Sequence, residues 1–358
     1  MNKERLRVLE MLQEGKITAE EAMGLLDRIP NDKEKTTQNH RDNREQQEDT
    51  QEEKTWWEET SKGIQDTIEQ ALDAAEDIDV NIILNPFNRG QQYMFFHHVP
   101  QGGKLNFLKL LAKNGGLKIK SHNDNKIKIE VKYNAKKGES MLYLQDNGGG
   151  LDLVYDYNAF RYLSIDCYIP RGLMIENIYA ENKNSSIKLE DVTGGRIELV
   201  TTNSSIKLED LKATEVIAQT TNSKISLERV EANMVRATTT NAKIESEQSH
   251  IEQLYAKTSN SSVKLQLNPD NQATTEDNVE YVVDVKTTNG NIKIEDTNML
   301  PMDLNASTSR GKVDFDYRDV VLKEMSQNYI DCKSQNYDQA SKKAKINLST
   351  TNGNIKIV

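Results

Sequence analysis

The chain is poor in cysteine, proline and aromatic residues. It holds 2 Cys and 6 Pro among 358 residues, and Phe, Trp and Tyr make up 6%. Cys167 and Cys332 are too few and too far apart for a disulfide framework or for the paired spacing of a zinc site. Cys167 lies on the isoleucine side of the alternating segment 165–169. We therefore expect it to be a small buried apolar residue.

Long apolar runs and an excess of positive charge are also absent. No stretch approaches the roughly 18 residues of a membrane-spanning helix, and the first 16 residues lack the features of a secretory signal. We therefore expect a cytoplasmic protein without an integral membrane segment, with cell-surface or peripheral membrane association as the alternative. The formal net charge of -10 opposes attraction to nucleic acid, so no nucleic-acid partner is predicted.

What the sequence does contain is a 19-residue repeat. Its marker is an asparagine that opens segments such as NSSIKLED and recurs at intervals of 19 residues. Two longer gaps follow before the last two members of the series. The complete series is Asn184, Asn203, Asn222, Asn241, Asn260, Asn289 and Asn352. A fixed period of about 20 residues indicates a solenoid, in which each repeat buries its apolar face against its neighbours.

Apolar residues occupy the same positions in every repeat. They lie six and four residues before the Asn and three residues after it, as in Ile197, Leu199 and Ile206. Alternation on both sides of a short polar corner predicts two strands of a parallel β-solenoid, whose inward side chains stack from coil to coil. The predicted fold class is therefore mainly β, with coils of about 19 residues. A small helical hairpin and an amphipathic helix are expected to precede the solenoid.

Charged residues occupy the outward positions of the repeat. Lys188 and Lys207 lie four residues after their Asn, and Glu190 and Glu209 lie six after it. These positions predict paired Lys and Glu ladders on a solvated surface. Asn tolerates left-handed backbone, and its amide can bond the same group one coil away. We therefore interpret the seven Asn residues as a structural column rather than as a ligand-binding row.

Residues 1–30 are predicted to form a helical hairpin. Leucines recur at helical spacing in the first helix, and Thr18 with Glu21 makes a capping box at the start of the second. Leu25 and Leu26 belong to the apolar stripe of that second helix. Two such short helices bury too little surface to be stable alone. We therefore expect this hairpin to bind a protein partner or to self-associate.

Residues 31–55 are predicted to be a disordered acidic linker. Residues 31–54 contain no aliphatic or aromatic side chain, so they cannot offset the entropy cost of ordering. Helical periodicity returns at residues 56–78, which begin with Trp56 and Trp57. We expect this amphipathic helix to cap the solenoid. A coiled contact with another copy and attachment to a membrane surface are alternatives, and the acidic polar face disfavours the last.

Residues 80–358 are assigned to the solenoid, with divergent early coils before residue 170. The period fails between Asn260 and Asn289, where a polar loop is expected, and again between Asn289 and Asn352. The second gap holds a Tyr- and Gln-rich insertion at 318–340, predicted to be a disordered or short helical loop. Tyr329, Tyr337 and Cys332 are expected to be exposed on it. We also expect the strand at 355–358 to leave an unpaired edge.

Two segments resemble known families. Ile169-Pro170-Arg171-Gly172, followed by repeated Thr-Thr-Asn and Ile-Lys-Leu/Ile-Glu, resembles the bacterial putative-adhesin β-solenoid family of unknown function. The stretch EGKITAEEA at 14–22 resembles the short bihelical SHOCT-like segments. Their combination resembles the YvlB/LiaX type from Gram-positive bacteria. This resemblance implies protein contacts in the response to cell-envelope stress, and it implies no catalytic residues.

The sequence therefore predicts a non-enzymatic interaction or scaffold protein with no catalytic, metal-binding or cofactor-binding residue. A surface adhesin and a carbohydrate-active β-helix enzyme are the alternatives. An adhesin needs an export route, and an enzyme needs a local acid and base pair, whereas the outward carboxylates here repeat coil after coil. The candidate partner contacts are Leu25, Leu26, Trp56, Trp57, Tyr329 and Tyr337.

Overall fold

The computed structural model describes residues 78–83, 91–99, 103–135, 142–147, 149–267, 279–296, 300–316 and 319–358. The chain divides into two compact units, Met1–Lys62 and Gly63–Val358. All described residues belong to the second unit. The predicted hairpin, linker and amphipathic helix lie outside the described residues, and so do Leu25, Leu26, Trp56 and Trp57.

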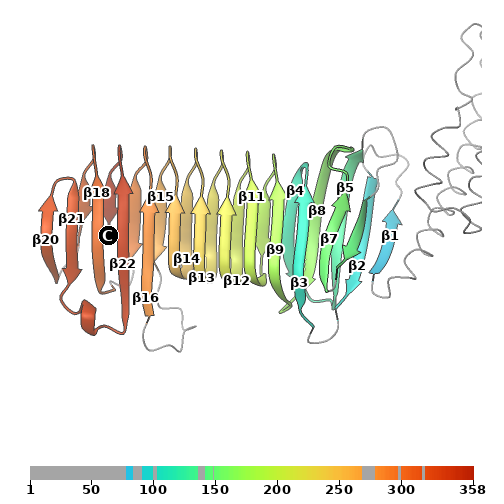
Figure 1. Cartoon of the computed structure of the whole chain (residues 1–358), viewed down its shortest axis with the longest axis horizontal. Coiled ribbons are helices and arrows are strands. Elements are labelled where there is room, and N and C mark those ends of the chain that lie inside the picture. Colours follow the sequence, from blue (N-terminus) through green and yellow to red (C-terminus); the bar gives the residue numbers. More distant parts are fainter. Residues whose placement is uncertain are drawn as a thin grey trace, which may run out of the picture. The chain divides into compact units, whose positions relative to one another are not determined.

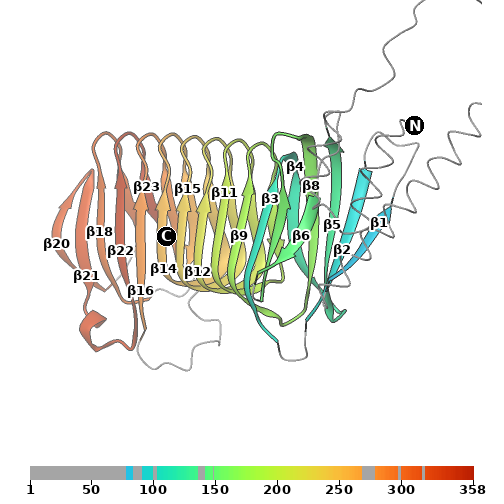
Figure 2. The ribbon, with the colours of Figure 1, turned by 45° about the vertical axis from the view of Figure 1, so that its right-hand side comes forward.

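Each regular coil has two strand segments that meet at two corners (Figures 1 and 2). One corner is the Asn corner. The other is a bend inside the long strands, as in β12 (Ile206–Gln219), where Asp210 has a φ of 50°. β12 pairs in parallel with β13 (Ile225–Thr238), and β13 pairs with β14 (Ile244–Lys257), each residue lying opposite the one 19 positions later. The predicted coil length is confirmed.

We call the strands that follow the Asn corner side A. They include the first segments of β12, β13 and β14, which are flanked by β10 (Ile187–Glu190) and β15 (Val263–Leu267). The order on the N-terminal flank is β1 (Ile78–Ile83), β2 (Gln91–His98), β5 (Lys126–Ala135), β8 (Phe160–Pro170), β4 (Asn114–His122) and β10. After β15 come β17 (Ile292–Asp296), β23 (Ile355–Ile357) and β19 (Val313–Phe315).

Side B holds the strands that lead into the Asn corner. Figure 1 views the solenoid from this side. Its N-terminal flank is β6 (Leu142–Asp146), β7 (Gly150–Tyr155), β3 (Leu105–Ala112), β9 (Met174–Asn182) and β11 (Thr193–Thr201). The second segments of β12, β13 and β14 follow. The C-terminal flank is β16 (Val279–Lys286), β22 (Lys342–Thr350), β18 (Met302–Thr308), β21 (Tyr329–Ser334) and β20 (Val320–Ser326).

The core lies between sides A and B and consists of stacked apolar columns. Ile197, Leu199 and Ile206 are fully buried, and so are their equivalents in the other coils, as predicted from the repeat. Cys167 is buried between Ile165 and Ile169, also as predicted. Fully burying one such aliphatic side chain contributes about 1.5–3 kcal/mol. The columns therefore hold neighbouring coils together along the described solenoid.

At both ends the order of the coils in space differs from their order in the chain. β3 and β4 form one coil, but β7 and β8 stack on one side of it while β9 and β10 stack on the other. At the C-terminal flank, β22 and β23 lie between the coil of β16 and β17 and the coil of β18 and β19. The last residues of the sequence therefore lie inside the stack.

The early region contains divergent coils, such as the coil of β3 and β4, together with strands β1, β2, β5 and β6, which pair antiparallel. Two expectations about the C-terminal flank are wrong. The insertion is not a loop along most of its length, because residues 319–340 form the β20–β21 hairpin, which is followed by a single short 3₁₀ helix, η1 (Tyr337–Gln339). The strand near residue 355 has no free edge, because β23 pairs with β17 and with β19. The polar loop 268–278 lies outside the described residues.

Candidate interaction surfaces

The Asn corner is a continuous hydrogen-bonded ladder. From Asn184 to Asn352, each Nδ2 donates to the Oδ1 of the Asn one coil away, at 2.6 to 2.8 Å. The ladder begins at Asn114, which has a φ of 57° and which the 19-residue series did not identify. Each internal Asn side chain thus donates one hydrogen bond to one neighbour and accepts one from the other. This pairing is what a structural column of asparagines requires.

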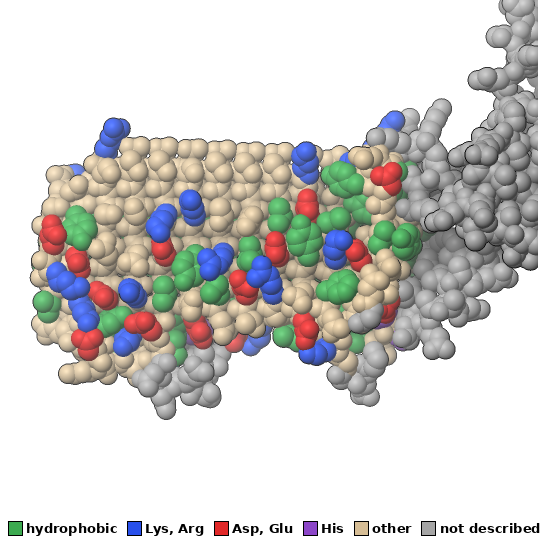
Figure 3. Space-filling model, viewed as in Figure 1, with side chains coloured by type: hydrophobic (Ala, Val, Ile, Leu, Met, Phe, Trp, Pro, Cys, Tyr) green, Lys and Arg blue, Asp and Glu red, His purple; other side chains and the backbone are tan. Residues whose placement is uncertain are grey.

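Buried threonines support the ladder from beneath. Thr220, Thr239 and Thr258 stand two residues before their Asn, and each Oγ1 donates to a backbone carbonyl of the preceding corner at 2.9 to 3.1 Å. Each such bond contributes about 0.5–1.5 kcal/mol net. Figure 3 shows side B, where the strip along the Asn corner carries few charged side chains. The corner is therefore a polar, internally bonded edge.

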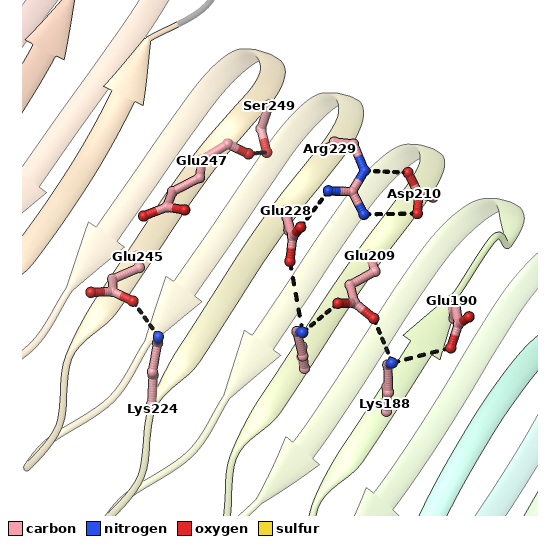
Figure 4. A network of polar contacts seen from close by, with 11 residues as sticks. Lys188, Glu190, Glu209, Asp210, Lys224, Glu228, Arg229, Glu245, Glu247 and Ser249 are labelled. Atoms are coloured by element: carbon pink, nitrogen blue, oxygen red, sulfur yellow. Dashed lines mark hydrogen bonds and ion pairs between the residues drawn. The ribbon is translucent and has the colours of Figure 1, made fainter.

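The outward positions on side A form the Lys and Glu ladders that the repeat predicts (Figure 4). Lys188 Nζ lies 2.5 Å from Glu209 and 3.1 Å from Glu190, and Lys207 contacts Glu209 as well. Hydrogen bonds from Lys188 and then from Lys207 lower the pKa of Glu209 to about 2. Glu209 is therefore an ionised, paired carboxylate at neutral pH.

The lysine ladder is interrupted in two coils. Ser226 and Glu245 take the positions that Lys207 and Lys264 hold in the flanking coils. Lys224 and Lys243 compensate, because both contact Glu245. Burial raises the pKa of Glu245, but hydrogen bonds from these two lysines outweigh that effect and lower it. The interruption therefore changes which lysines neutralise the carboxylates and supplies no proton donor for acid catalysis.

The second corner carries a charge pair that spans two coils. Arg229 approaches Asp210 with two nitrogens, Nε at 2.6 Å and Nη2 at 3.0 Å, and it also contacts Glu228 (Figure 4). The bidentate geometry fixes the neighbouring corners relative to each other. These side chains remain partly exposed, so the pair contributes little to stability. Among the described residues, no group of three or more His, Cys, Asp or Glu side chains is placed to hold a metal ion.

One irregularity in the core was not predicted from the sequence. Ser246 and Ser249 take the places of leucine and valine in two apolar columns, and the pairing between β14 and β15 shifts at this point. His250, next along the chain, is buried edge-on against Tyr281 at 5.5 Å between ring centroids. Neither His250 nitrogen has a hydrogen-bond partner among the residues that the structure describes. The visible signal is the segment ESEQSH, which breaks the pattern of the other repeats.

The tyrosines predicted to be exposed on the insertion have structural contacts. Tyr337 is only 5% exposed, and its hydroxyl donates to Glu280 Oε1 at 2.7 Å. Tyr329 is partly buried, and its hydroxyl accepts a hydrogen bond from Asn305 Nδ2 at 3.0 Å. Cys332 is fully buried on β21. The expectation of exposure is therefore wrong for Tyr337 and Cys332: the pairing of β21 with β18 buries Cys332, and Tyr337 in η1 is held against Glu280.

Exposed apolar side chains gather on the neighbouring strand, β20. Val321, Leu322 and Met325 are 53%, 50% and 61% exposed. Within the described chain, β20 pairs with β21 alone, so its other edge presents free backbone groups. The other exposed large apolar side chains among the described residues lie near the N-terminal flank, and they are Tyr143, Tyr157, Tyr162 and Met174. None of this group lies in the regular coils between β11 and β17.

Leu322 and Met325 on β20 continue the row of apolar side chains that is buried on β21. Leu322 lies opposite Cys332, and Met325 lies opposite Ile330, and both of these β21 residues are fully buried. The register shifts at Lys323, whose Nζ lies 3.2 Å from Asp331 and 3.4 Å from Asp303. The inner face of the sheet thus continues onto β20. We call this strand, Val320–Ser326, the β20 edge.

The family is shown by a match that covers most of the solenoid. The model of the family described as Toastrack DUF4097 matches residues 109–358. The chain belongs to the Toastrack DUF4097 family. A SHOCT-like domain model matches residues 3–33, so both parts of the resemblance are confirmed. In this Toastrack chain, no helix among the described residues has the length and hydropathy needed to cross a bilayer.

Solved structures with similarity to this chain are described as adhesins. A "putative cell adhesion protein" from Clostridium sporogenes is 12% identical, covers 78% of this chain and 97% of its own, and gives a TM-score of 0.23. A "putative adhesin" from Bacteroides fragilis is 9% identical over 75% and 97%, with a TM-score of 0.40. Another from Parabacteroides merdae is 10% identical over 79% and 96%, with a TM-score of 0.36. The search of curated proteins found no match.

Proposed function

We propose that this Toastrack protein is a non-enzymatic interaction protein whose solenoid is a rigid scaffold and whose β20 edge binds a partner protein. The observation that carries the proposal is the exposure of Val321, Leu322 and Met325 on a strand paired on one side. The outward carboxylates of the regular coils on side A are instead neutralised by lysines. The β20 edge thus combines exposed apolar side chains with an unpaired strand edge.

Strand addition is the mode of binding that fits this edge. A partner strand placed beside β20 gains main-chain hydrogen bonds, while pockets for alternate side chains give specificity. Burying Leu322 and Met325 would complete the apolar inner face that β21 begins. The bulge at Lys323 and its ion pairs with Asp303 and Asp331 oppose indiscriminate edge pairing. The partner must therefore accommodate the bulge.

The wider role follows from the resemblance. We assign the protein to the response to cell-envelope stress, acting in the cytoplasm through protein contacts. In this scheme the hairpin of residues 1–30 recruits a partner or a second copy, and residues 31–55 tether it to the solenoid. Support comes from the SHOCT-like match at residues 3–33, which joins an interaction module to the Toastrack solenoid in one chain.

The test compares two exposed methionines at opposite flanks. Met325→Lys, combined with Val321→Thr, changes the β20 edge, and Met174→Lys is the matched control. Each tagged chain is used for pull-down from source cells grown with and without a cell-wall antibiotic, followed by quantitative mass spectrometry. We expect the amount of a stress-dependent partner recovered with the β20 variant to fall at least tenfold, whereas the control variant recovers the parent's amount. Circular dichroism checks that both variants keep the β-sheet signal.

Two outcomes would contradict the proposal. If the β20 variant retains its partners while deletion of residues 1–54 removes them, the contact belongs to the N-terminal module and the β20 assignment is wrong. If purified protein turns over a polysaccharide and loses that turnover on Glu209→Gln, the protein is an enzyme and the non-enzymatic assignment is wrong.

A further inference from the structure

The coil formed by β22 and β23, residues 342–358, occupies a slot between two other coils of the chain. β22 pairs in register with β16 on one side and with β18 on the other. β23 pairs with β17 and with β19. We call this position the coil slot. Because both walls of the slot precede residue 342 in the sequence, this coil is an insertion into the stack rather than an addition to its end.

The coil fills the slot completely. Its inward side chains, Ala344, Ile346, Leu348, Ile355 and Ile357, are at most 1% exposed. Thr350 Oγ1 donates to the Gly290 carbonyl at 2.9 Å, and Thr308 Oγ1 donates to the Gly353 carbonyl at 2.8 Å. The Asn352 amide donates to Asn289 at 2.6 Å. Both walls of the slot thus contact the coil through backbone pairing, through its buried apolar side chains and through hydrogen bonds at the Asn corner.

The corner of the slot selects a glycine. A Cβ on Gly353 would lie 1.9 Å from the Gly290 carbonyl oxygen, and a Cβ on Gly311 would lie 1.9 Å from the Gly353 oxygen. The corresponding corner position in the earlier repeats is serine or alanine, at Ser185, Ser204, Ser223, Ala242 and Ser261. A segment that enters the slot must therefore carry glycine after its ladder Asn, which those repeats do not.

The sequence that fits the slot occurs twice in the chain. Residues 287–294 and residues 350–357 are both TTNGNIKI, and they stack in register from Ile292 opposite Ile355 to Ile294 opposite Ile357. One copy of this octapeptide forms a wall of the slot, and the other fills it. The slot is thus complementary to a segment that any second copy of this chain also presents.

A short connection decides which chain fills the slot. Residues 335–341 join β21 to β22, and Tyr337 anchors them through its hydrogen bond to Glu280. Lys333 Nζ holds Asp338 at 2.6 Å, and the Lys343 ammonium lies 5.1 Å from the centre of the Tyr337 ring. These contacts keep the connection folded back within one chain. If it opens, the same coil reaches the slot of a neighbour with every slot contact retained.

We propose that the coil slot is a binding site for residues 342–358 of a second copy, so that two chains associate by exchanging this coil. Exchange costs little because the contacts inside the slot are identical in the closed and exchanged forms. The two forms differ in the anchored connection and in the entropy of association. This proposal concerns self-association and does not depend on the β20 edge.

The experiment uses cysteines on strands that face each other across the slot. Asn305 on β18 and Asn347 on β22 are directly paired positions with partly exposed side chains. Neighbouring strands lie about 4.8 Å apart, which is within the Cα separation that a disulfide bridges. One full-length chain carries Asn305→Cys, and a second, differently tagged chain carries Asn347→Cys. Because neither chain holds both cysteines, a disulfide forms between them only if the coil of one occupies the slot of the other. The native Cys167 and Cys332 are buried.

We expect co-expressed Asn305→Cys and Asn347→Cys chains to give a disulfide-linked heterodimer on oxidation, with twice the monomer mass by light scattering. Asn305→Cys paired with Lys257→Cys, an exposed position on β14, controls for random collisions and should give none. Adding Tyr337→Phe removes a hydrogen bond to Glu280 that only the closed form needs. It should raise the yield of heterodimer roughly tenfold at the same concentration.

A chain with both Asn305→Cys and Asn347→Cys tests the slot itself. Closure of an internal disulfide in this chain, together with no heterodimer above the Lys257→Cys control across a tenfold range of concentration, would overturn the proposal. Failure of the internal disulfide to close would overturn it as well, because the coil would then not occupy the slot. The β20 substitutions lie outside the coil slot, so they should not change the yield of the cross-linked heterodimer. A failure of the self-association proposal can therefore be distinguished from a failure of the proposed β20 interaction.

Discussion

Replacing Gly353 by alanine is expected to loosen the C-terminal flank of the solenoid. The added Cβ would lie 1.9 Å from the Gly290 carbonyl oxygen and 2.4 Å from the carbon of that carbonyl, which are backbone atoms of the neighbouring coil. The two corners must therefore separate by more than about 1 Å to reach ordinary contact. Such a separation stretches the 2.6 Å bond from Asn352 to Asn289 and the 2.9 Å bond from Thr350 to Gly290.

The magnitude follows from these two effects. Overpacking a tight site costs about 1–3 kcal/mol, and each weakened hydrogen bond costs about 0.5–1.5 kcal/mol. The sum over the overpacking and the two hydrogen bonds is roughly 2–6 kcal/mol of unfolding free energy. Since about 2 °C of melting temperature corresponds to 1 kcal/mol in a domain of this size, we expect Gly353→Ala to lower the melting temperature by roughly 4–12 °C.

The measurement is thermal unfolding followed by circular dichroism, combined with hydrogen exchange of residues 342–358. Ser223→Ala is the matched control, because the same corner position in a regular coil already carries a Cβ. It should change the melting temperature by less than about 1 °C. A Gly353→Ala protein that melts within 1 °C of the parent, with unchanged exchange in residues 342–358, would show that the corners separate freely and would refute the reasoning.

Three further outcomes are expected. Asn222→Ala should cost about 1–3 kcal/mol, because it removes one bond to each neighbour in the ladder. Hydrogen bonds from two lysines lower the pKa of Glu209 to about 2. The stabilisation that ionised Glu209 gives the folded protein is therefore fully present above the ordinary pKa of 4.5 and is lost as the pH falls from 4.5 toward 2. Glu209→Gln should flatten the dependence of the unfolding free energy on pH in this range. Burial raises the pKa of the Cys332 thiol to about 11 and raises that of Cys167, so neither should react with a thiol reagent at pH 8 in the folded protein.

Each of these outcomes has its own check. For the ladder, Asn222→Ser should cost no more than the alanine variant, and an unchanged unfolding midpoint would contradict a structural role for the column. For the acid transition, Glu252→Gln on side B is the control, because Glu252 forms no ion pair with another described residue, and equal curves for the parent and Glu209→Gln would contradict the paired carboxylate. For the thiols, full reaction on unfolding in urea sets the scale, and rapid reaction before unfolding would show that the C-terminal hairpin opens.

The environment of a side chain is predictable from the sequence where its position repeats from coil to coil. Ile206, Lys207 and Glu209 each stand in a column of equivalent residues, and a stack of parallel coils gives every member of a column the same environment. One alignment of the repeats therefore predicted burial, the charged ladders and the Asn corner together. The same reasoning missed Asn114, because its coil lies 70 residues from the next Asn of the ladder.

Strands that pair with distant segments are not predictable in this way. The hairpin of β20 and β21 has an alternating pattern in residues 329–334, but its Tyr- and Gln-rich composition led us to predict a loop. The burial of Cys332 and Tyr337 depends on β18 and Glu280, neither of which is adjacent in sequence. No local pattern identifies such partners. The exposed side chains of the β20 edge become recognisable only when the covered strands beside them are known.

By itself the sequence determined the 19-residue coil, the two alternating segments on either side of the Asn corner, and which side chains face the core or the solvent. These properties depend on the alternation of apolar and polar residues along each strand and on the stacking of equivalent residues in successive coils. Both patterns can be read from the repeated sequence alone. Only the tertiary structure decided the order of the coils at the two flanks and the location of residues 342–358 within the stack. The physical reason is that TTNGNIKI pairs equally well with a neighbour on either side, so its own sequence cannot specify which coils enclose it.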